Sequence, residues 1–295
     1  MPDIRYHPGM KVVTTLSELR AARDGFGRLA FVPTMGALHA GHVSLMRQAK
    51  LHAPTVAASI FVNPQQFAPH EDLTKYPRPI EKDLAMCEEA GVDLVFVPEV
   101  ATVYPPGVSE VTLNVPELAR LWEGERRPTH FAGVCLVVAK LFNMVKPQVA
   151  CFGEKDFQQL AVIRAMTRAL DFDIDIVGCP IVREPDGLAM SSRNVYLTRE
   201  QRLRAAFISE ALFAARDGAF DRVQDVIAFT SDRIMNVPDV LKGVPVQIDY
   251  LQLVDIDKLE PATDFSAPRQ LITTVRVGLT WLLDNVRLEA SSDRH

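Results

Sequence analysis

Apolar positions along the first 180 residues form two patterns that alternate. Short, almost wholly apolar runs have the length and β-branched composition of buried strands, and apolar positions three and four apart indicate amphipathic helices. The predicted strands span residues 29–32, 55–62, 93–97, 111–115, 148–152 and 174–177. The predicted helices span residues 11–28, 79–90 and 131–145, and two more follow Gly41 and Asp156, the second of which ends at Leu170.

Strands that alternate with helices favour a mostly parallel sheet with helices on both faces, so we predict a Rossmann-like α/β fold for this part. After Pro180 the pattern changes to longer helical segments followed by strands. The change predicts a second, smaller α+β domain. We therefore expect a first domain of residues 1–181 and a carboxy-terminal domain of residues 182–295.

Three stretches predict the second domain. Residues 199–235 predict two helical segments that break near Gly218. Residues 246–254 and 269–279 have the composition of strands, with turn residues between them. The tail, residues 290–295, is predicted to be disordered, because termini that nothing holds are poorly ordered.

Composition narrows the class of protein without identifying it. The 295 residues are 48% hydrophobic and 23% charged, as in soluble globular proteins, and the net charge of −5 argues against a broad nucleic-acid-binding surface. The purest apolar stretch, residues 131–139, is too short to cross a membrane, and the first residues do not resemble a signal peptide. Four scattered cysteines favour reduced thiols. We expect a cytoplasmic protein that binds neither nucleic acid nor membrane.

The junction between strand 29–32 and the next helix carries the clearest chemical signal. His39 and His42 lie three residues apart, so both imidazoles fall on one face of a first helical turn, where backbone N–H groups and the helix dipole suit phosphate. Gly41 leaves space for a flat ring such as adenine. The pattern His-x-Gly-His after a first strand resembles the signature of the nucleotidyltransferase superfamily. Helix-capping or core histidines stay open as alternatives, and so does zinc, although no third ligand lies nearby in the sequence.

Four more polar clusters fall on predicted loops or at the domain junction. The amides of residues 63–66 suit the hydroxyls and carboxylate of a small polar substrate. Residues 152–159 combine a glycine, a lysine and acidic residues at a strand-to-helix junction, which suits phosphate and ribose. The hydroxyls and guanidinium of residues 190–194 can donate to β- and γ-phosphate oxygens. Glu123 and Arg127 form the fourth cluster. Taken singly, each cluster is also typical of a turn, a helix start, an N-cap or a surface ion pair.

Together these motifs resemble the pantothenate synthetase family, the pantoate–β-alanine ligases. The matching segments follow the expected order between residues 32 and 285, so they cover nearly the whole chain. They read VPTMGALHAGH, SIFVNPQQF, YPR, RPTHFAGV, FGEKDFQQL, VREPDGLAMSSRN and LLDN. Any one of them could arise by chance, but the series is specific.

The resemblance implies an enzyme that condenses (R)-pantoate with β-alanine in two steps, using ATP and Mg²⁺. The pantoate carboxylate attacks the α-phosphate of ATP, which gives pantoyl adenylate and pyrophosphate. The β-alanine amine then attacks the activated carbonyl and releases AMP. Because the first step brings an anion to a polyanion, the site must neutralise charge as it develops. A carboxylate nucleophile needs no base, so hydrogen-bond donors and cations have the larger role.

The resemblance also implies a role for each matching residue. The catalytic residues would be His39, His42, Lys155 and Arg193. ATP would be bound by Met35, Gly36, Ala37, Leu38, His39, Gly41, His42, Gly153, Glu154, Lys155, Asp156, Val182, Met190, Ser191, Ser192 and Arg193. Pantoate and β-alanine would be bound by Pro33, Thr34, Met35, Asn63, Gln66, Val137, Val138 and Gln159. Tyr76, Glu123 and Arg127 would shape the site, and Asp83 is the best match for an acidic neighbour of Mg²⁺.

The resemblance further implies that the domain of residues 1–181 binds nucleotide and pantoate and forms a homodimer, and that the second domain closes as a lid. Two other functions stay open on the sequence. One is a nucleotidyltransferase that transfers AMP or CMP to a phosphorylated small molecule, although such relatives often begin with a Gly-x-Phe-Asp-Pro run and this chain has Val-Pro-Thr-Met-Gly at residues 32–36. The other is a non-enzymatic nucleotide-binding protein.

Overall fold

The computed structural model describes residues 9–68 and 73–290, and the chain divides into two compact units. The first unit comprises Met1–Arg120, Gly124–Glu154 and Val162–Pro180, and the second comprises Leu121–Glu123, Lys155–Ala161 and Ile181–His295. Two short segments that precede the predicted boundary therefore group with the carboxy-terminal residues. Each unit has a hydrophobic core of its own. The predicted disordered tail, from residue 291 onward, lies outside the described residues.

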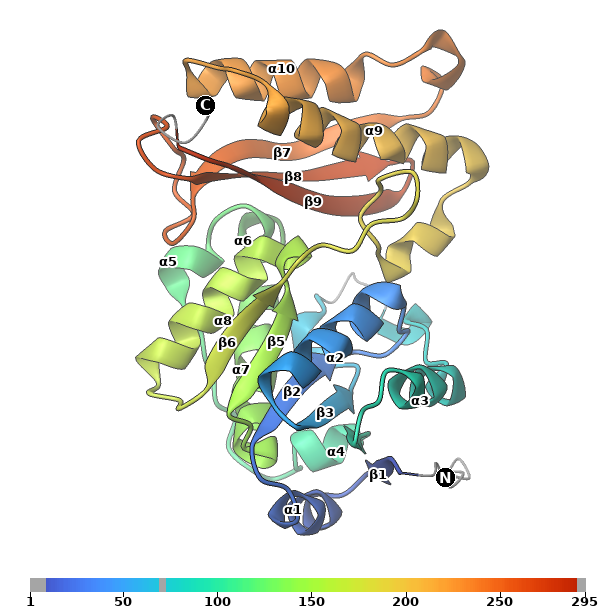
Figure 1. The fold of residues 1–295 in the computed structure, drawn as a ribbon, viewed down its shortest axis with the longest axis vertical. Helices are drawn as coiled ribbons and strands as arrows, with labels where there is room; N and C mark the ends of the chain where they lie inside the picture. Colours follow the sequence, from blue (N-terminus) through green and yellow to red (C-terminus); the bar gives the residue numbers. More distant parts are fainter. Residues whose placement is uncertain (1–8, 69–72, 291–295) are drawn as a thin grey trace. The chain divides into compact units, whose positions relative to one another are not determined.

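A six-stranded parallel sheet forms the centre of the first unit (Figure 1). In sheet order its strands are β1 (Lys11–Val13), β4 (Leu94–Phe96), β3 (Thr55–Ile60), β2 (Leu29–Thr34), β5 (Val149–Gly153) and β6 (Asp175–Cys179). β2 and β3 are buried along almost their whole length, as expected of strands covered on both faces. The chain continues from β2 to β3 on one side and from β5 to β6 on the other. The carboxyl ends of β2 and β5 therefore form a topological switch point, where such sheets bind ligands.

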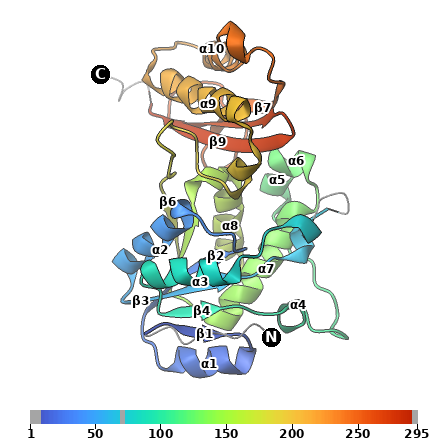
Figure 2. The same cartoon turned by 90° about the vertical axis from the view of Figure 1, so that its right-hand side faces the viewer.

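Helices cover both faces of this sheet (Figure 2). α2 (Ala40–His52) and α3 (Ile80–Glu89) lie against one face, and α1 (Leu16–Asp24) and α7 (His130–Val145) lie against the other. α7 is apolar on nearly all sides, and most of its residues are buried. The shorter elements are α4 (Val100–Val103), α5 (Pro116–Ala119), α6 (Glu123–Arg126) and the three-ten turns η1 (Pro64–Gln66), η2 (Leu73–Lys75) and η3 (Glu154–Asp156). α8 (Phe157–Ala169) begins in the second unit and ends in the first.

The second unit is an antiparallel sheet with two helices on one face. Its strands are β7 (Val246–Asp255), β8 (Arg269–Val277) and β9 (Thr280–Leu288), and its helices are α9 (Arg199–Asp217) and α10 (Val223–Met235). The three-ten turns η4 (Ser192–Tyr196) and η5 (Asp239–Leu241) flank them. Alternate residues of the strands join apolar residues of both helices in one core. α9 begins at a capping box formed by Thr198 and Gln201.

These elements confirm the predicted α/β fold class with a smaller carboxy-terminal α+β part. Two element predictions are wrong, and one long strand was not predicted. Residues 11–13 form a strand instead of the start of a helix, and residues 111–115 form no strand. Residues 280–288 form β9, which was not predicted as a strand. Within residues 9–68 and 73–290, no helix is long and apolar enough to cross a membrane, and all four cysteines are free and buried.

Candidate active site

A buried carboxylate holds the loop that follows β2. The oxygens of Asp83, on α3, accept the backbone N–H groups of Ala37 and Leu38, each at 2.8 Å. Gly36 and Ala37 have positive φ angles of 79° and 51°, and a Cβ on Gly36 would lie 2.9 Å from Asp83 Oδ2. Only glycine fits the first position, because it combines this backbone conformation with close approach. Burial raises the pKa of the Asp83 carboxyl above its ordinary value, although the two N–H groups oppose that rise.

This geometry gives Asp83 a role different from the predicted one beside Mg²⁺. Its carboxylate is 1% exposed, and each oxygen already accepts a backbone N–H group. Among the described residues, no group of three or more His, Cys, Asp or Glu side chains could hold a metal ion. The described residues do not fit a protein-bound metal, so no step of the chemistry is assigned to one.

His39 and His42 form the first turn of α2. Nδ1 of His39 accepts the N–H of Gly41 at 3.1 Å, and Nδ1 of His42 accepts the N–H of His39 at 3.3 Å. The two bonds make a reciprocal capping box with His39 as the N-cap, and the ring centroids lie 4.1 Å apart. A neutral imidazole that accepts at Nδ1 carries its proton on Nε2. Both rings are therefore hydrogen-bond donors at Nε2.

Asn63 caps η1 and Gln66 is its last residue, and this turn packs against α7. Asn63 Oδ1 accepts the N–H of Gln65 at 3.2 Å. Asn63 Nδ2 donates to Gln66 Oε1 at 3.0 Å and to the carbonyl of Gly133 at 3.1 Å. Tyr104 donates its hydroxyl to Asn63 Oδ1 at 2.8 Å. The two amides thus hold each other in one arrangement at the end of the strand that precedes them.

Arg127, just before α7, and His130, its first residue, contact the backbone of the same turn. Arg127 Nη2 lies 3.2 Å from the carbonyl oxygen of Gln66, and His130 Nδ1 lies 3.0 Å from it. The role of Arg127 in shaping the site stays a prediction. Neither His130 nor Tyr104 was identified from the sequence as a support of η1. His130 belongs to the motif RPTHFAGV, and membership of that motif was the only indication of its importance in the sequence.

Further predicted residues of the first unit lie around these groups. Thr34 is buried at the end of β2, where its hydroxyl donates to the carbonyl of Ser59 at 2.7 Å and accepts the N–H of Gly36 at 3.2 Å. Val137 and Val138 are buried in α7. The remaining predicted residues of this unit are Pro33 and Met35 beside Thr34, Gly153 and Glu154 after β5, and Tyr76, whose ring meets Phe67 edge-on at 6.0 Å.

In the second unit, Lys155 and Asp156 lie in η3, and Gln159 lies in the first turn of α8. The neighbouring Gln158 is buried and holds the segment around Glu123. Its Oε1 accepts the N–H of Glu123 at 3.0 Å, and its Nε2 donates to the carbonyl of Leu121 at 2.7 Å. Gln159 was predicted as a site residue, whereas Gln158, one position away in the same motif, was not.

Val182 and Met190 lie opposite each other in a hairpin. The N–H of Met190 donates to the carbonyl of Val182 at 2.9 Å, and Arg183 pairs with Ala189. The turn of the hairpin includes Gly187, with φ +87°. Directly after it, Ser191 caps η4 and accepts the N–H of residue 193 on its Oγ at 3.2 Å.

The structure thus collects the predicted residues into two sets. The first unit holds the loop after β2, the start of α2, η1, Asp83, Tyr76, Arg127, Val137, Val138 and the end of β5. The second unit holds Glu123, Lys155, Asp156, Gln159, Val182, Met190, Ser191, Ser192 and Arg193. Arg193 has an exposed side chain, whereas Ser191 and Ser192 are partly buried.

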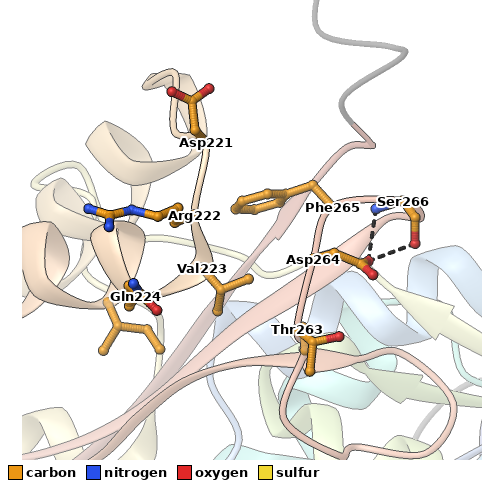
Figure 3. A pocket seen from close by; sticks show the side chains of 10 residues that line it. Asp221, Arg222, Val223, Gln224, Thr263, Asp264, Phe265 and Ser266 are labelled. Carbon is orange, nitrogen blue, oxygen red and sulfur yellow. Dashed lines mark hydrogen bonds between the residues drawn. The ribbon is translucent and has the colours of Figure 1, made fainter.

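A cavity of about 660 Å³ opens in the second unit between the start of α10 and residues 262–266 (Figure 3). Asp264 at its edge accepts hydrogen bonds from the N–H and the hydroxyl of Ser266, at 3.0 and 2.6 Å. None of the residues that line it was predicted as a site residue. The cavity is therefore not counted as part of the candidate site.

Comparison with known proteins matches the chain over nearly its whole length. The family model described as "Pantoate-beta-alanine ligase" matches residues 11–287. A pantothenate synthetase of Thermobifida fusca is 48% identical over 96% of this chain and 97% of its own length. A pantothenate synthetase of Thermus thermophilus is 46% identical over 95% of this chain and 99% of its own length.

Solved structures give the same result. A crystal structure of the Thermus thermophilus enzyme covers 94% of this chain and 99% of its own, with a TM-score of 0.86 and 45% identity. A pantoate–β-alanine ligase of Francisella tularensis, crystallised with "Beta-gamma ATP and Beta-alanine", covers 94% of this chain and 97% of its own, with a TM-score of 0.76 and 29% identity.

The α/β fold and the similarity to these ligases over nearly the whole chain make it an enzyme that forms a carbon–nitrogen bond. It belongs to the pantoate–β-alanine ligase family. Membership decides against the alternative of a nucleotidyltransferase that leaves the nucleotide in its product.

Proposed function

We propose that this chain condenses (R)-pantoate with β-alanine to give pantothenate, through a pantoyl-adenylate intermediate. The pantoate carboxylate oxygen bonds to the α-phosphorus of ATP, and pyrophosphate leaves. The β-alanine nitrogen then bonds to the carbonyl carbon, the carbon–oxygen bond to the phosphate breaks, and AMP leaves together with the amine proton. Adenylation is required because a free carboxylate has no leaving group that an amine can displace.

The histidine pair at the start of α2 carries this proposal. Both rings are fixed by backbone bonds to Nδ1, so each carries its N–H donor on Nε2 at a helix N-terminus. Donors fixed before the reaction stabilise charge that develops on the α-phosphate at little reorganisation cost. We assign both histidines to donate hydrogen bonds to the phosphates, with His42 nearest the α-phosphate. The backbone from Met35 to Leu38, with Gly41, would lie along the nucleotide.

The acid and amine substrates are assigned to two glutamine amides and a set of mostly apolar residues. Gln66 would bind the pantoate hydroxyls and carboxylate, because Asn63 already fixes its amide oxygen. Gln159 would complete these contacts. Pro33, Thr34, Met35, Val137 and Val138 would supply the apolar walls for the pantoate methyl groups and the β-alanine chain.

The remaining donors are assigned to the nucleotide. Lys155 would neutralise phosphate charge with its ammonium group, and Arg193 with its planar guanidinium group. Ser191 and Ser192 would donate hydroxyl hydrogen bonds to the β- and γ-phosphates. Gly153, Glu154 and Asp156 would lie near the ribose, and Val182 and Met190 near adenine. The hairpin bond between Val182 and Met190 supports assigning them to one subsite.

Several coarser points complete the proposal. Mg²⁺ would enter with ATP, held by phosphate oxygens, since the carboxylate predicted beside it is engaged by backbone N–H groups. We also propose a domain boundary between residues 181 and 182, a homodimer and a cytoplasmic location. The sequence pattern and the family resemblance support these three points.

Product analysis tests the function. The protein is incubated with ATP, Mg²⁺ and D-pantoate, with and without β-alanine, while pyrophosphate, AMP and pantothenate are followed. We expect pyrophosphate in an amount equal to enzyme without β-alanine, and turnover to AMP and pantothenate when it is added. Pyrophosphate release that does not depend on pantoate would contradict the proposal.

A further inference from the structure

The LLDN motif, residues 282–285, has no role in the reaction described above. It lies in β9, and its last two residues, Asp284 and Asn285, are buried at 4% exposure each. Leu282 and Val286 point into the core beneath α9 and α10, so alternation puts Asp284 on that face of the sheet and Asn285 on the other. Two adjacent polar residues thus reach different segments on opposite faces of one strand.

Asp284 anchors the hairpin that carries Val182 and Met190. Its carboxylate accepts Nη1 and Nη2 of Arg183 at 2.6 and 2.8 Å, a bidentate pair. Arg183 also donates to the carbonyl of Gly187 at 3.1 Å, which ties the hairpin turn to the same guanidinium. The guanidinium stacks 4.6 Å from the ring centroid of Phe213 on α9. The base of the hairpin is therefore fixed to β9 and α9.

Asn285 anchors the backbone of Lys155. Its Nδ2 donates to the carbonyl of Lys155 at 2.9 Å, and its Oδ1 accepts Nε2 of Gln270 at 2.6 Å. The second bond determines which end of the amide faces Lys155. The Asn285 N–H donates to Asp284 Oδ1 at 2.7 Å, so the two anchors are joined.

We propose that Asp284 and Asn285 are positioning residues that hold Lys155 and the Val182–Met190 hairpin in fixed register on β9. The inference rests on the proposed function, in which both segments bind ATP. The polar contacts of both side chains described here are made to other residues of the protein. Each acts through the backbone or guanidinium it binds, and a displacement of about 1 Å at a charge-stabilising group can cost roughly a hundredfold in rate.

A double-mutant cycle separates positioning from general destabilisation. The adenylation rate is measured in a single turnover for wild type, Asn285→Ala, Lys155→Ala and the double variant. We expect Asn285→Ala to lower the rate about tenfold or more in the wild-type background and to change it little in the Lys155→Ala background, because the group it positions is gone. Equal losses in both backgrounds, or no loss in the first, would overturn the assignment of Asn285.

Arg183→Lys tests the Asp284 anchor and does not depend on whether Asn285→Ala folds. It keeps the charge and removes the fork, so we expect a higher KM for ATP with an unchanged KM for β-alanine. An unchanged KM for ATP would overturn the Asp284 anchor. Gln247→Ala is the matched control, since Gln247 is an exposed amide on β7 of the same sheet that accepts a hydrogen bond from Arg276. It should leave both constants as in wild type.

The same assay distinguishes the inference from the function on which it rests. A wild-type enzyme that releases no pantoate-dependent pyrophosphate overturns the proposed function and this inference with it. If the wild-type enzyme releases pantoate-dependent pyrophosphate and the variants behave like wild type, this inference alone is overturned.

Discussion

His39 and His42 each serve the fold and the chemistry with different ring nitrogens. Nδ1 satisfies a backbone N–H group that the helix itself cannot pair, and this bond determines that the proton sits on Nε2. The capping alternative that the sequence left open is therefore compatible with the phosphate-binding one. The same residues meet both requirements.

Substitution of His42 should separate these two contributions. We expect His42→Ala to slow adenylation by about two orders of magnitude or more, the scale for losing a donor to transition-state charge. We expect it to lower the free energy of unfolding by only about 1 kcal/mol, because one cap bond is lost. Single-turnover kinetics and thermal unfolding measure the two effects.

His42→Glu is the control for stability. Glutamate at this third helical position can accept the same N–H group of His39, so the unfolding temperature should stay close to that of wild type. The rate should remain low, because a carboxylate repels phosphate. Adenylation near the wild-type rate in either variant would contradict the assigned role.

Arg193 offers a second test at the residue scale. Its exposed side chain follows the Ser191 cap of η4, so its packing contributes little to stability. We expect Arg193→Lys to raise the KM for ATP, since a lysine keeps the charge and loses the planar fork that matches phosphate oxygens. Unchanged KM and kcat would show that charge alone is sufficient there.

Several residue roles could not be predicted, because their partners are remote in sequence. Asp83 accepts N–H groups from Ala37 and Leu38, which lie 46 and 45 positions before it in the sequence. His130 lies 64 positions after its partner Gln66. Local spacing identifies a group that can bind phosphate or a metal. It gives no information on whether a backbone N–H from another element already occupies that group.

At the element scale, the contact between α7 and η1 depends on one glycine. A Cβ on Gly133 would lie 2.2 Å from the carbonyl oxygen of Gln65 and 2.7 Å from Cα of Gln66. Any side chain there would push η1 away from the helix. The turn that presents Asn63 and Gln66 can therefore reach its observed position only against a residue without Cβ.

We expect Gly133→Ala to displace η1, to raise the KM for pantoate and to lower the free energy of unfolding by about 1–3 kcal/mol through overpacking. Steady-state kinetics at saturating ATP and chemical denaturation measure these effects. Gly27→Ala is the matched control in the same unit, because nothing lies within 4 Å of a Cβ at that position and its φ is not positive. A Gly133→Ala enzyme with the wild-type KM for pantoate would refute the role of this contact.

Periodicity located most elements and failed where an element is short or lacks a partner. β1 has three residues, too few for a period, and its Lys-Val-Val run merged with the helix after it. Residues 111–115 alternate as a strand does, but Val111 is 65% exposed and pairs with no strand of the described chain. β9 follows β8 after the turn at Gly278, and the sequence prediction ended there.

At the scale of the whole molecule, each unit has a carboxylate whose charged form the fold stabilises. Hydrogen bonds from the Thr14 and Thr15 backbone lower the pKa of Glu18 from 4.5 to about 2. In the second unit, hydrogen bonds from Ser266 and then Arg269 lower the pKa of Asp264 from 3.8 to about 2. A carboxyl with a lowered folded-state pKa binds fewer protons when folded than when unfolded, so its contribution is lost as pH falls.

We therefore expect the contribution of Asp264 to be complete above about pH 5 and to disappear as the pH falls through 3.8 toward about 2. Asp264→Asn should be less stable than wild type at neutral pH, and the difference should shrink over this range. Thermal unfolding at a series of pH values measures it. A difference that stays constant down to about pH 2 would show that the carboxylate charge contributes nothing.

The central claim is that the pantoate carboxylate attacks the α-phosphate of ATP, and an isotope experiment tests it most directly. Pantoate with both carboxylate oxygens replaced by ¹⁸O is turned over with ATP, Mg²⁺ and β-alanine, and the products are analysed by mass spectrometry. We expect one ¹⁸O in AMP, one in the pantothenate amide carbonyl and none in pyrophosphate. Label in inorganic phosphate, with ADP as the nucleotide product, would mean attack at the γ-phosphate and would contradict the claim.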